Sequence, residues 1–136
     1  MDTVDNGAQR GQPEPGDAIV FTYAGTVDPD LILPGWDGST TGVTVRIEGN
    51  RTEDVVTVRD PSDDSVLTGL GLVRTDGYYA DTAIFSNSQM TLSGTTVTIV
   101  LGTLSGTTHR DPSAKALVWS TPQGSATESG HPDSNF

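Results

Sequence analysis

The chain has 136 residues, and its 18 acidic side chains outnumber its 7 basic ones, which gives a formal net charge of -11. This balance argues against nucleic acid as a partner, because affinity for phosphates depends on Lys and Arg, and equally against an anionic membrane surface. We expect the acidity to keep the protein soluble through self-repulsion. The chain lacks cysteine, which excludes disulfides and thiolate metal sites.

Length and hydrophobic content predict one domain with a thin core. A chain of this length is an ordinary single domain, and 33% of its residues are hydrophobic. No apolar run approaches the ~20 residues that span a bilayer, and the acidic N-terminus lacks the apolar segment of a secretory signal. We expect either that a signal was removed or that the protein reaches its destination without one.

The first segment with strand character follows a polar leader. Residues 1–16 are rich in polar side chains, Gly and Pro, and we expect them to form an extended arm against neighbouring subunits. Apolar residues then alternate with others over 19–23, which predicts a strand with one strongly apolar face. Asp28-Pro29 turns the chain, and residues 31–33 form a short apolar run that ends at Pro34-Gly35.

Further apolar segments follow in chain order, each bounded by turn residues. We expect strands within residues 43–47, 55–58, 67–73, 78–85, 89–92, 96–101 and 115–119. The glycines of 67–73 suggest a bulge, and residues 102–114 are expected to form a polar loop. Turn signals recur about every 8–12 residues, and no segment has helical periodicity, so the pattern predicts an all-β sandwich or barrel.

Trp36 lies in a glycine-rich loop over residues 35–42 and has two interpretations. It can fold over one end of the sandwich as part of the core, which is the interpretation that we favour. It can also form an exposed platform for a ligand. A glycoside hydrolase would need a cleft rimmed by such aromatics, and the chain has only two Trp and three Tyr.

The sequence offers no strong catalytic constellation. A Ser/His/Asp site needs a nucleophile on a sharp turn and a histidine held by a carboxylate. The two histidines, His109 and His131, lie in polar segments, and no Gly-x-Ser-x-Gly motif is present. We therefore expect solvated surface histidines and no enzyme activity.

Acidic loops are the candidates for a metal site. Two histidines without cysteine are a poor zinc set, whereas carboxylates and loop carbonyls suffice for calcium. The candidates are Asp28 with Asp30, and Asp60 with Asp63 and Asp64. No spacing matches the EF-hand loop, and Asp-Pro pairs are common turn formers. We expect turns here and no cofactor, with calcium as the alternative.

Several motifs together resemble bacterial immunoglobulin-like modules. They lie in order along the chain, at residues 16–23 (GDAIVFTY) with Asp28-Pro29, then 33–38, 43–47, 90–99, 117–120 and 128–130. As a set they are similar to modules of actinobacterial surface proteins and of structural proteins from phages that infect those bacteria. The loop between Trp119 and Glu128 is shorter than in these modules. The resemblance implies an immunoglobulin-like antiparallel β-sandwich of about seven to nine short strands without catalytic residues.

The expected organisation is an extended polar arm (1–16), a sandwich (17–120) and an extended polar tail (121–136). The resemblance favours a phage virion protein on the capsid surface, a decoration protein that binds the major capsid protein, copies of itself, or both. A trimer is expected by analogy. The residues expected to contact partners are Gln9, Arg10, Gln12, Pro13, Trp36 and Phe136.

Three other functions remain open at this point. One is a tail-surface module of the virion. Another is a secreted or cell-wall adhesion module of an actinobacterial surface protein, located outside the cell or on its surface. The last is a carbohydrate-binding or calcium-dependent accessory domain of an enzyme.

Overall fold

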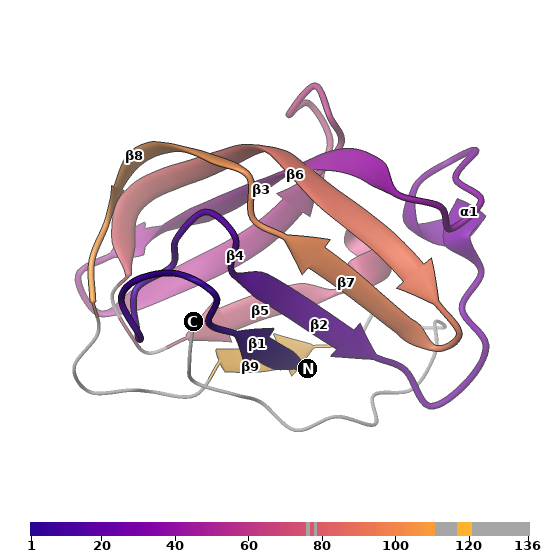
Figure 1. Cartoon of the computed structure of the whole chain (residues 1–136), viewed down its shortest axis with the longest axis horizontal. Helices are drawn as coiled ribbons and strands as arrows, with labels where there is room; N and C mark the ends of the chain where they lie inside the picture. Colours follow the sequence, from indigo (N-terminus) through magenta and orange to yellow (C-terminus); the bar gives the residue numbers. More distant parts are fainter. Residues whose placement is uncertain (76, 78, 111–116, 121–136) are drawn as a thin grey trace.

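The computed structural model describes residues 1–75, 77, 79–110 and 117–120, and its nine strands form one curled antiparallel sheet (Figure 1). The strands of the described residues are β1 (Asp2–Val4), β2 (Ala18–Thr22), β3 (Thr41–Asn50), β4 (Glu53–Arg59), β5 (Leu72–Thr75), β6 (Ala80–Ser93), β7 (Thr96–Val100), β8 (Thr103–Thr108) and β9 (Leu117–Ser120). Their order is β1-β2-β7-β6-β3-β4-β5-β9, and β8 pairs with β6. The predicted all-β antiparallel class is confirmed.

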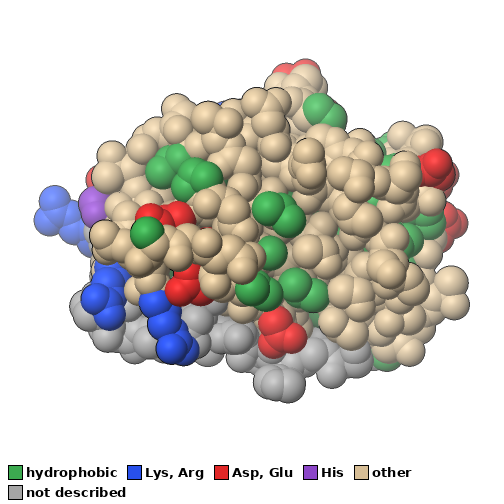
Figure 2. Space-filling view, viewed as in Figure 1, with side chains coloured by type: hydrophobic (Ala, Val, Ile, Leu, Met, Phe, Trp, Pro, Cys, Tyr) green, Lys and Arg blue, Asp and Glu red, His purple; other side chains and the backbone are tan. Residues whose placement is uncertain are grey.

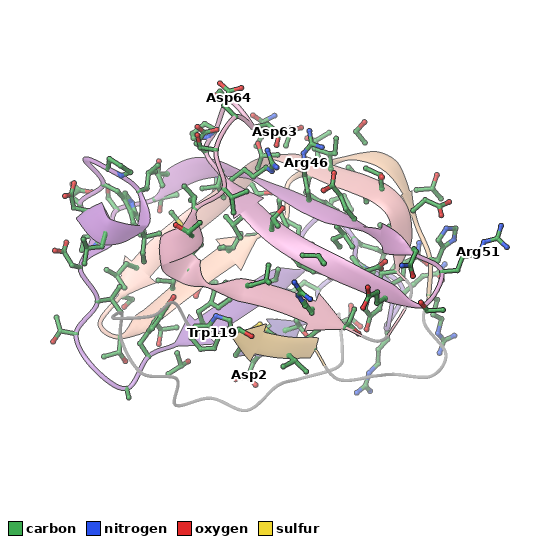
Figure 3. The ribbon with its side chains drawn as sticks, turned by 180° about the vertical axis from the view of Figure 1, so that it is seen from behind. Asp2, Arg46, Arg51, Asp63, Asp64 and Trp119 are labelled. Carbon is green, nitrogen blue, oxygen red and sulfur yellow. The ribbon has the colours of Figure 1, made fainter. Side chains whose placement is uncertain are left out.

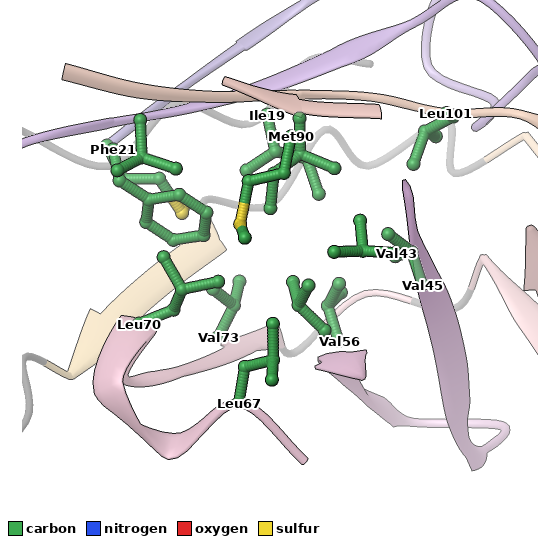
Figure 4. Close-up of a cluster of buried hydrophobic side chains, with 14 of the residues drawn as sticks. Ile19, Phe21, Val43, Val45, Val56, Leu67, Leu70, Val73, Met90 and Leu101 are labelled. Carbon is green, nitrogen blue, oxygen red and sulfur yellow. The ribbon is translucent and has the colours of Figure 1, made fainter. Parts of the chain in front are cut away.

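The core lies between the two halves of this sheet, so a single curled sheet supplies both layers of the sandwich. Ile19 and Phe21 of β2 and Met90 of β6 point inward from one layer (Figure 4). Val56 of β4 and Val73 of β5 face them from the other layer. Alternate side chains of each strand point to the same face, which is why the apolar alternation in the sequence marks the buried surface.

The 14-residue strand β6 joins two segments that the sequence pattern separates. Its first part pairs with β8 and its last part with β7. Between them Asn87 adopts a φ of 53°, and the Ser88 hydroxyl donates to the Phe85 carbonyl (2.9 Å) and accepts the Gly102 N–H (3.0 Å). The irregularity therefore bends one strand, and does not end it.

Gly102, where β7 passes into β8, has no room for a side chain. A Cβ at this position would lie 2.2 Å from the Ser86 carbonyl oxygen and 2.6 Å from the backbone of Asn87. Since backbone atoms cannot move as a flexible side chain can, Gly102→Ala should lower the free energy of unfolding by about 2 kcal/mol. Urea denaturation measures this loss. Gly94→Ala is the comparison variant. A Cβ at Gly94 would have no neighbouring atom within 4 Å, so only the strain of its positive φ should lower stability there.

Two sequence expectations were wrong in detail, and one segment that the sequence left unassigned is a helix. The predicted polar loop over 102–114 contains strand β8, which is largely exposed and therefore lacks an apolar face. The predicted strand over 67–73 begins as a 3-10 helix, η1 (Thr68–Leu70), before β5 starts. The apolar run at 31–33 belongs largely to the one-turn helix α1 (Pro29–Ile32), which Asp28 caps by accepting the Asp30 N–H.

Residues 1–16 lie on the body of the domain and do not extend away from it. Strand β1 pairs with β2, with Thr3 opposite Ile19. Met1 and Thr3 are buried, so their side chains help to close the core at this edge of the sheet. The expected extended arm is thus replaced by an edge strand and a loop that return along the sandwich.

Candidate functional site

One buried carboxylate holds the N-terminal loop in place. Asp17 precedes β2, and its Oδ1 accepts N–H groups from Asn6 (2.9 Å) and Gly7 (2.8 Å). Its Oδ2 accepts the Glu14 N–H (2.8 Å). Burial raises the pKa of Asp17, while these three backbone hydrogen bonds oppose the rise. Asp17 is therefore an anchor for residues 6–14, and its oxygens are already engaged within the chain.

The four contact residues predicted in this loop differ in accessibility. Gln9 and Arg10 are exposed at its tip. Pro13 is buried, and the Gln12 side chain donates to the Thr108 carbonyl (3.2 Å) and hydroxyl (3.1 Å) at the end of β8. Gln12 and Pro13 thus fasten the loop to its own domain, and contact of a partner with any of the four residues stays a prediction.

Trp36 belongs to the core, as the favoured interpretation of the sequence predicts. Its side chain is 7% exposed, and its indole Nε1–H donates to the Ser39 carbonyl (2.6 Å). The ring is therefore not an exposed platform, but Trp36 lines an open pocket with Leu33 and Thr41, so contact of a partner with Trp36 stays a prediction. Phe136 and His131 lie outside the described residues. His109 follows β8, and its backbone N–H donates to the Tyr79 carbonyl.

The carboxylates proposed for calcium shape their own loops. Asp28 caps α1, and Asp30 accepts the Gly35 N–H (2.6 Å). Asp60 accepts the Asp64 N–H (2.8 Å), a bond that lowers the pKa of Asp60. Within the described ranges, no group of three His, Cys, Asp or Glu side chains is arranged to hold a metal ion.

Asp63 is held over the outer face of β3 and β4 by two arginines (Figure 3). Arg46 Nε donates to Asp63 Oδ1 (2.8 Å), Arg46 Nη2 pairs with Oδ2, and Arg59 Nε lies 3.7 Å from Oδ1. Hydrogen bonding to Arg46 is the main cause that holds the pKa of Asp63 below its usual range. The loop over 60–64 is therefore fixed by an ion pair.

This ion pair should stabilise the fold only while Asp63 is ionised. Because its folded pKa lies below the unfolded value of about 4, the contribution is present above that value and is lost as pH falls through the folded pKa. Asp63→Asn should therefore destabilise the protein at neutral pH and lose its effect in strong acid. Urea denaturation over a pH series tests this, with Asp64→Asn as the neighbouring control. A cost of Asp63→Asn that does not change with pH would contradict the prediction.

One face of the sheet has a single charged side chain, that of Asp2, which is unusual in so acidic a chain. It is the outer face of β1, β2, β7 and the last part of β6, opposite the buried Ile19, Val97 and Met90. We call it the uncharged face, and its members are Val4, Ala18, Val20, Thr22, Gln89, Thr91, Ser93, Thr96, Thr98 and Val100. Asp2 lies on the same face, opposite Val20 on the edge strand β1, and is its one charged residue. In Figure 2, hydrophobic and neutral side chains cover the region where Figure 1 draws β2 and β7.

A groove lies between α1 and the segment before η1. It is lined by residues from two distant parts of the chain, namely Leu31, Ile32, Leu33 and Pro34 on one side and Asp60, Ser65, Val66, Leu67 and Thr68 on the other. Leu31 is 70% exposed and Val66 37% exposed. The sequence analysis missed this groove, because only the fold brings residues 31–34 and 65–68 together.

A scan against protein-family models, a search of curated proteins and a search of solved structures each found no match to this chain. Membership of the bacterial immunoglobulin-like modules therefore stays a prediction from the sequence motifs. In the described part of the chain, no helix is long and apolar enough to span a membrane.

Proposed function

We propose that this protein is a non-enzymatic structural protein of a phage virion, a capsid decoration protein that binds the outer surface of the head and stabilises it. The observation that carries the proposal is the uncharged face on a domain whose net charge is -11. The centres of protein interfaces are depleted of charged residues, so a face with one charged side chain on so acidic a chain favours a contact surface. Partners on this proposal are the major capsid protein and other copies of the chain.

The area of the face favours several contacts on a repeating surface such as a shell over one contact with a single partner. Neighbouring strands lie about 4.8 Å apart and rise about 3.3 Å per residue, so the face of four short strands has an area of roughly 300 Å². A stable pairwise interface needs about 800 Å² on each partner. On a shell, several small contacts made by an oligomer add through avidity, and preferential binding to the assembled shell stabilises it by mass action.

Gold labelling of a phage lysate with antibody against this domain tests the location. Label over heads would support a decoration protein, and label along tails would support the tail-surface alternative. Bare virions with label on host cell walls would overturn the proposal in favour of the adhesion module.

A charge placed on the uncharged face tests the surface itself. Thr98→Lys should abolish binding of the purified protein to undecorated heads, because the lysine would have to be desolvated in the contact. Thr107→Lys on the exposed strand β8 is the matched control and should bind as the unchanged protein does. Equal binding of both variants would remove the uncharged face from the proposal.

A further inference from the structure

The groove beside α1 combines an exposed apolar side chain with a preformed hollow. Leu31 has the largest exposed fraction among the large hydrophobic residues of the described chain. The hollow beside it measures about 380 Å³, and Val66 borders it from the opposite side. An apolar side chain of a partner could therefore contact Leu31 and Val66 together.

The walls of this groove are held by backbone contacts. Pro29 at the first helical position and the Asp28 cap define the single turn of α1. The backbone of η1 lies directly against it, since a Cβ at Gly69 would lie 2.4 Å from the Leu31 carbonyl oxygen. A groove fixed in this way is largely formed before a partner arrives, which lowers the entropic cost of binding.

Acidic residues border the groove, and one basic residue, Arg59, lies beside it through an isolated β-bridge with Val66. Segments 28–45 and 60–73 have no Lys or Arg. Asp63 is neutralised by Arg46 and Arg59 from the sheet, whereas Asp60 lines the groove and Asp64 projects from the same loop (Figure 3). Figure 2 shows further acidic side chains at the end of the molecule where Figure 1 draws α1.

We propose that this groove binds a partner segment that presents one bulky apolar side chain flanked by Lys or Arg. The apolar side chain would contact Leu31 and Val66, and the flanking cations would lie near Asp60, which lines the groove, and Asp64 of the same loop. Complementary charge of this kind steers association and selects partners. A second copy of the chain is a poor occupant, because it would place another set of carboxylates against this rim.

This inference goes beyond the proposed function and uses none of the residues of the uncharged face. A basic segment with an apolar anchor can belong to a capsid subunit or to any other protein. The two proposals therefore fail separately: Thr98→Lys tests the uncharged face, and substitutions at Leu31 and Asp60 test the groove.

The test is a titration of the isotope-labelled full chain with synthetic peptides, followed by amide NMR shifts. Each peptide carries a central Leu, Phe or Trp between pairs of lysines. Control peptides replace the central residue by Gly, or the lysines by Glu. The lysine peptides with an apolar centre should shift the amides of residues 31–33 and 66–68, and both kinds of control should fail to do so.

Substitutions in the protein distinguish the apolar and the charged contributions. Leu31→Ser should weaken binding by about 10-fold, which corresponds to loss of one exposed apolar contact. Asp60→Asn, which keeps an acceptor for the Asp64 N–H, should reduce both the affinity and its dependence on salt. Val118→Ser is the matched control, because Val118 is 55% exposed on β9, and it should leave binding unchanged.

Three outcomes would overturn the groove proposal. One is that no lysine peptide shifts residues 31–33 and 66–68. Another is that Leu31→Ser binds as tightly as the unchanged chain. The last is that the Gly-centred peptide binds equally well, since attraction to the negative charge of the protein alone would then explain the binding.

Discussion

Replacement of Asp17 by alanine is expected to lower the free energy of unfolding by about 2–4 kcal/mol. The substitution removes the acceptor of three backbone N–H groups, those of Asn6, Gly7 and Glu14. A buried donor left without a partner costs about 1–3 kcal/mol, and water entering beside the loop would recover part of that cost. Urea denaturation measures the total, and amide hydrogen exchange shows whether residues 6–14 open first.

Two variants make the Asp17 experiment specific. Asp5→Ala removes an exposed acceptor of the Gly7 N–H (3.1 Å) and should cost no more than about 0.5 kcal/mol. Asp17→Asn keeps one carbonyl oxygen and should fall between the other two variants. Equal stability of Asp17→Ala and Asp5→Ala would show that the carboxylate does not anchor the loop.

The same carboxylate should give a pH dependence opposite in sign to that of Asp63. Burial raises the folded pKa of Asp17 above its ordinary value, so the folded state holds this proton more tightly than the unfolded state. Its contribution is fully present below the unfolded pKa of about 4 and declines as pH rises through the folded pKa. The free energy of unfolding of the unchanged protein minus that of Asp17→Asn should therefore decrease as pH rises from about 4 through the folded pKa. A difference that rises with pH would contradict the assignment.

The sequence predicts strands well where a strand has one buried face. The alternation of Val43, Val45 and Ile47 identifies β3, and Val97 and Ile99 identify β7, because each set points into the core. The sequence does not predict strand β8, because β8 is exposed along most of its length and lacks alternating apolar residues. Strand β1 is three residues long and becomes visible only through its pairing with β2.

Candidate sites are less predictable, because they depend on which segments the fold brings together. The burial of Trp36 follows from local sequence, as a large aromatic residue in a loop between two apolar segments. The groove requires Leu31 and Val66 to meet, and they lie in separate loops. The uncharged face was visible in part as Thr and Val at alternate positions of 96–100, yet only the register with β2 and β6 assembles it.

Trp119 is where we expect the largest loss of stability from one side chain. It lies on β9 and is 6% exposed. Its ring makes edge contacts with Phe21 (5.2 Å between centroids) and Tyr23 (5.1 Å), and its indole N–H donates to the Leu70 carbonyl (2.8 Å). These contacts join the last strand of the sheet to β2, near its other end, and so close the sandwich.

Trp119→Ala should therefore lower the free energy of unfolding by about 3–5 kcal/mol, from lost burial and the cavity that remains. Against the 5–15 kcal/mol that stabilises an ordinary domain, this loss leaves a marginal fold. Trp119→Phe keeps much of the ring packing but leaves the Leu70 carbonyl without its donor, so about 1–3 kcal/mol is expected. Val118→Ser, on the outward side of the same strand, should change stability by less than about 0.5 kcal/mol. Denaturation followed by circular dichroism ranks the three variants, and a Trp119→Ala protein as stable as Val118→Ser would mean that β9 is not needed to close the core.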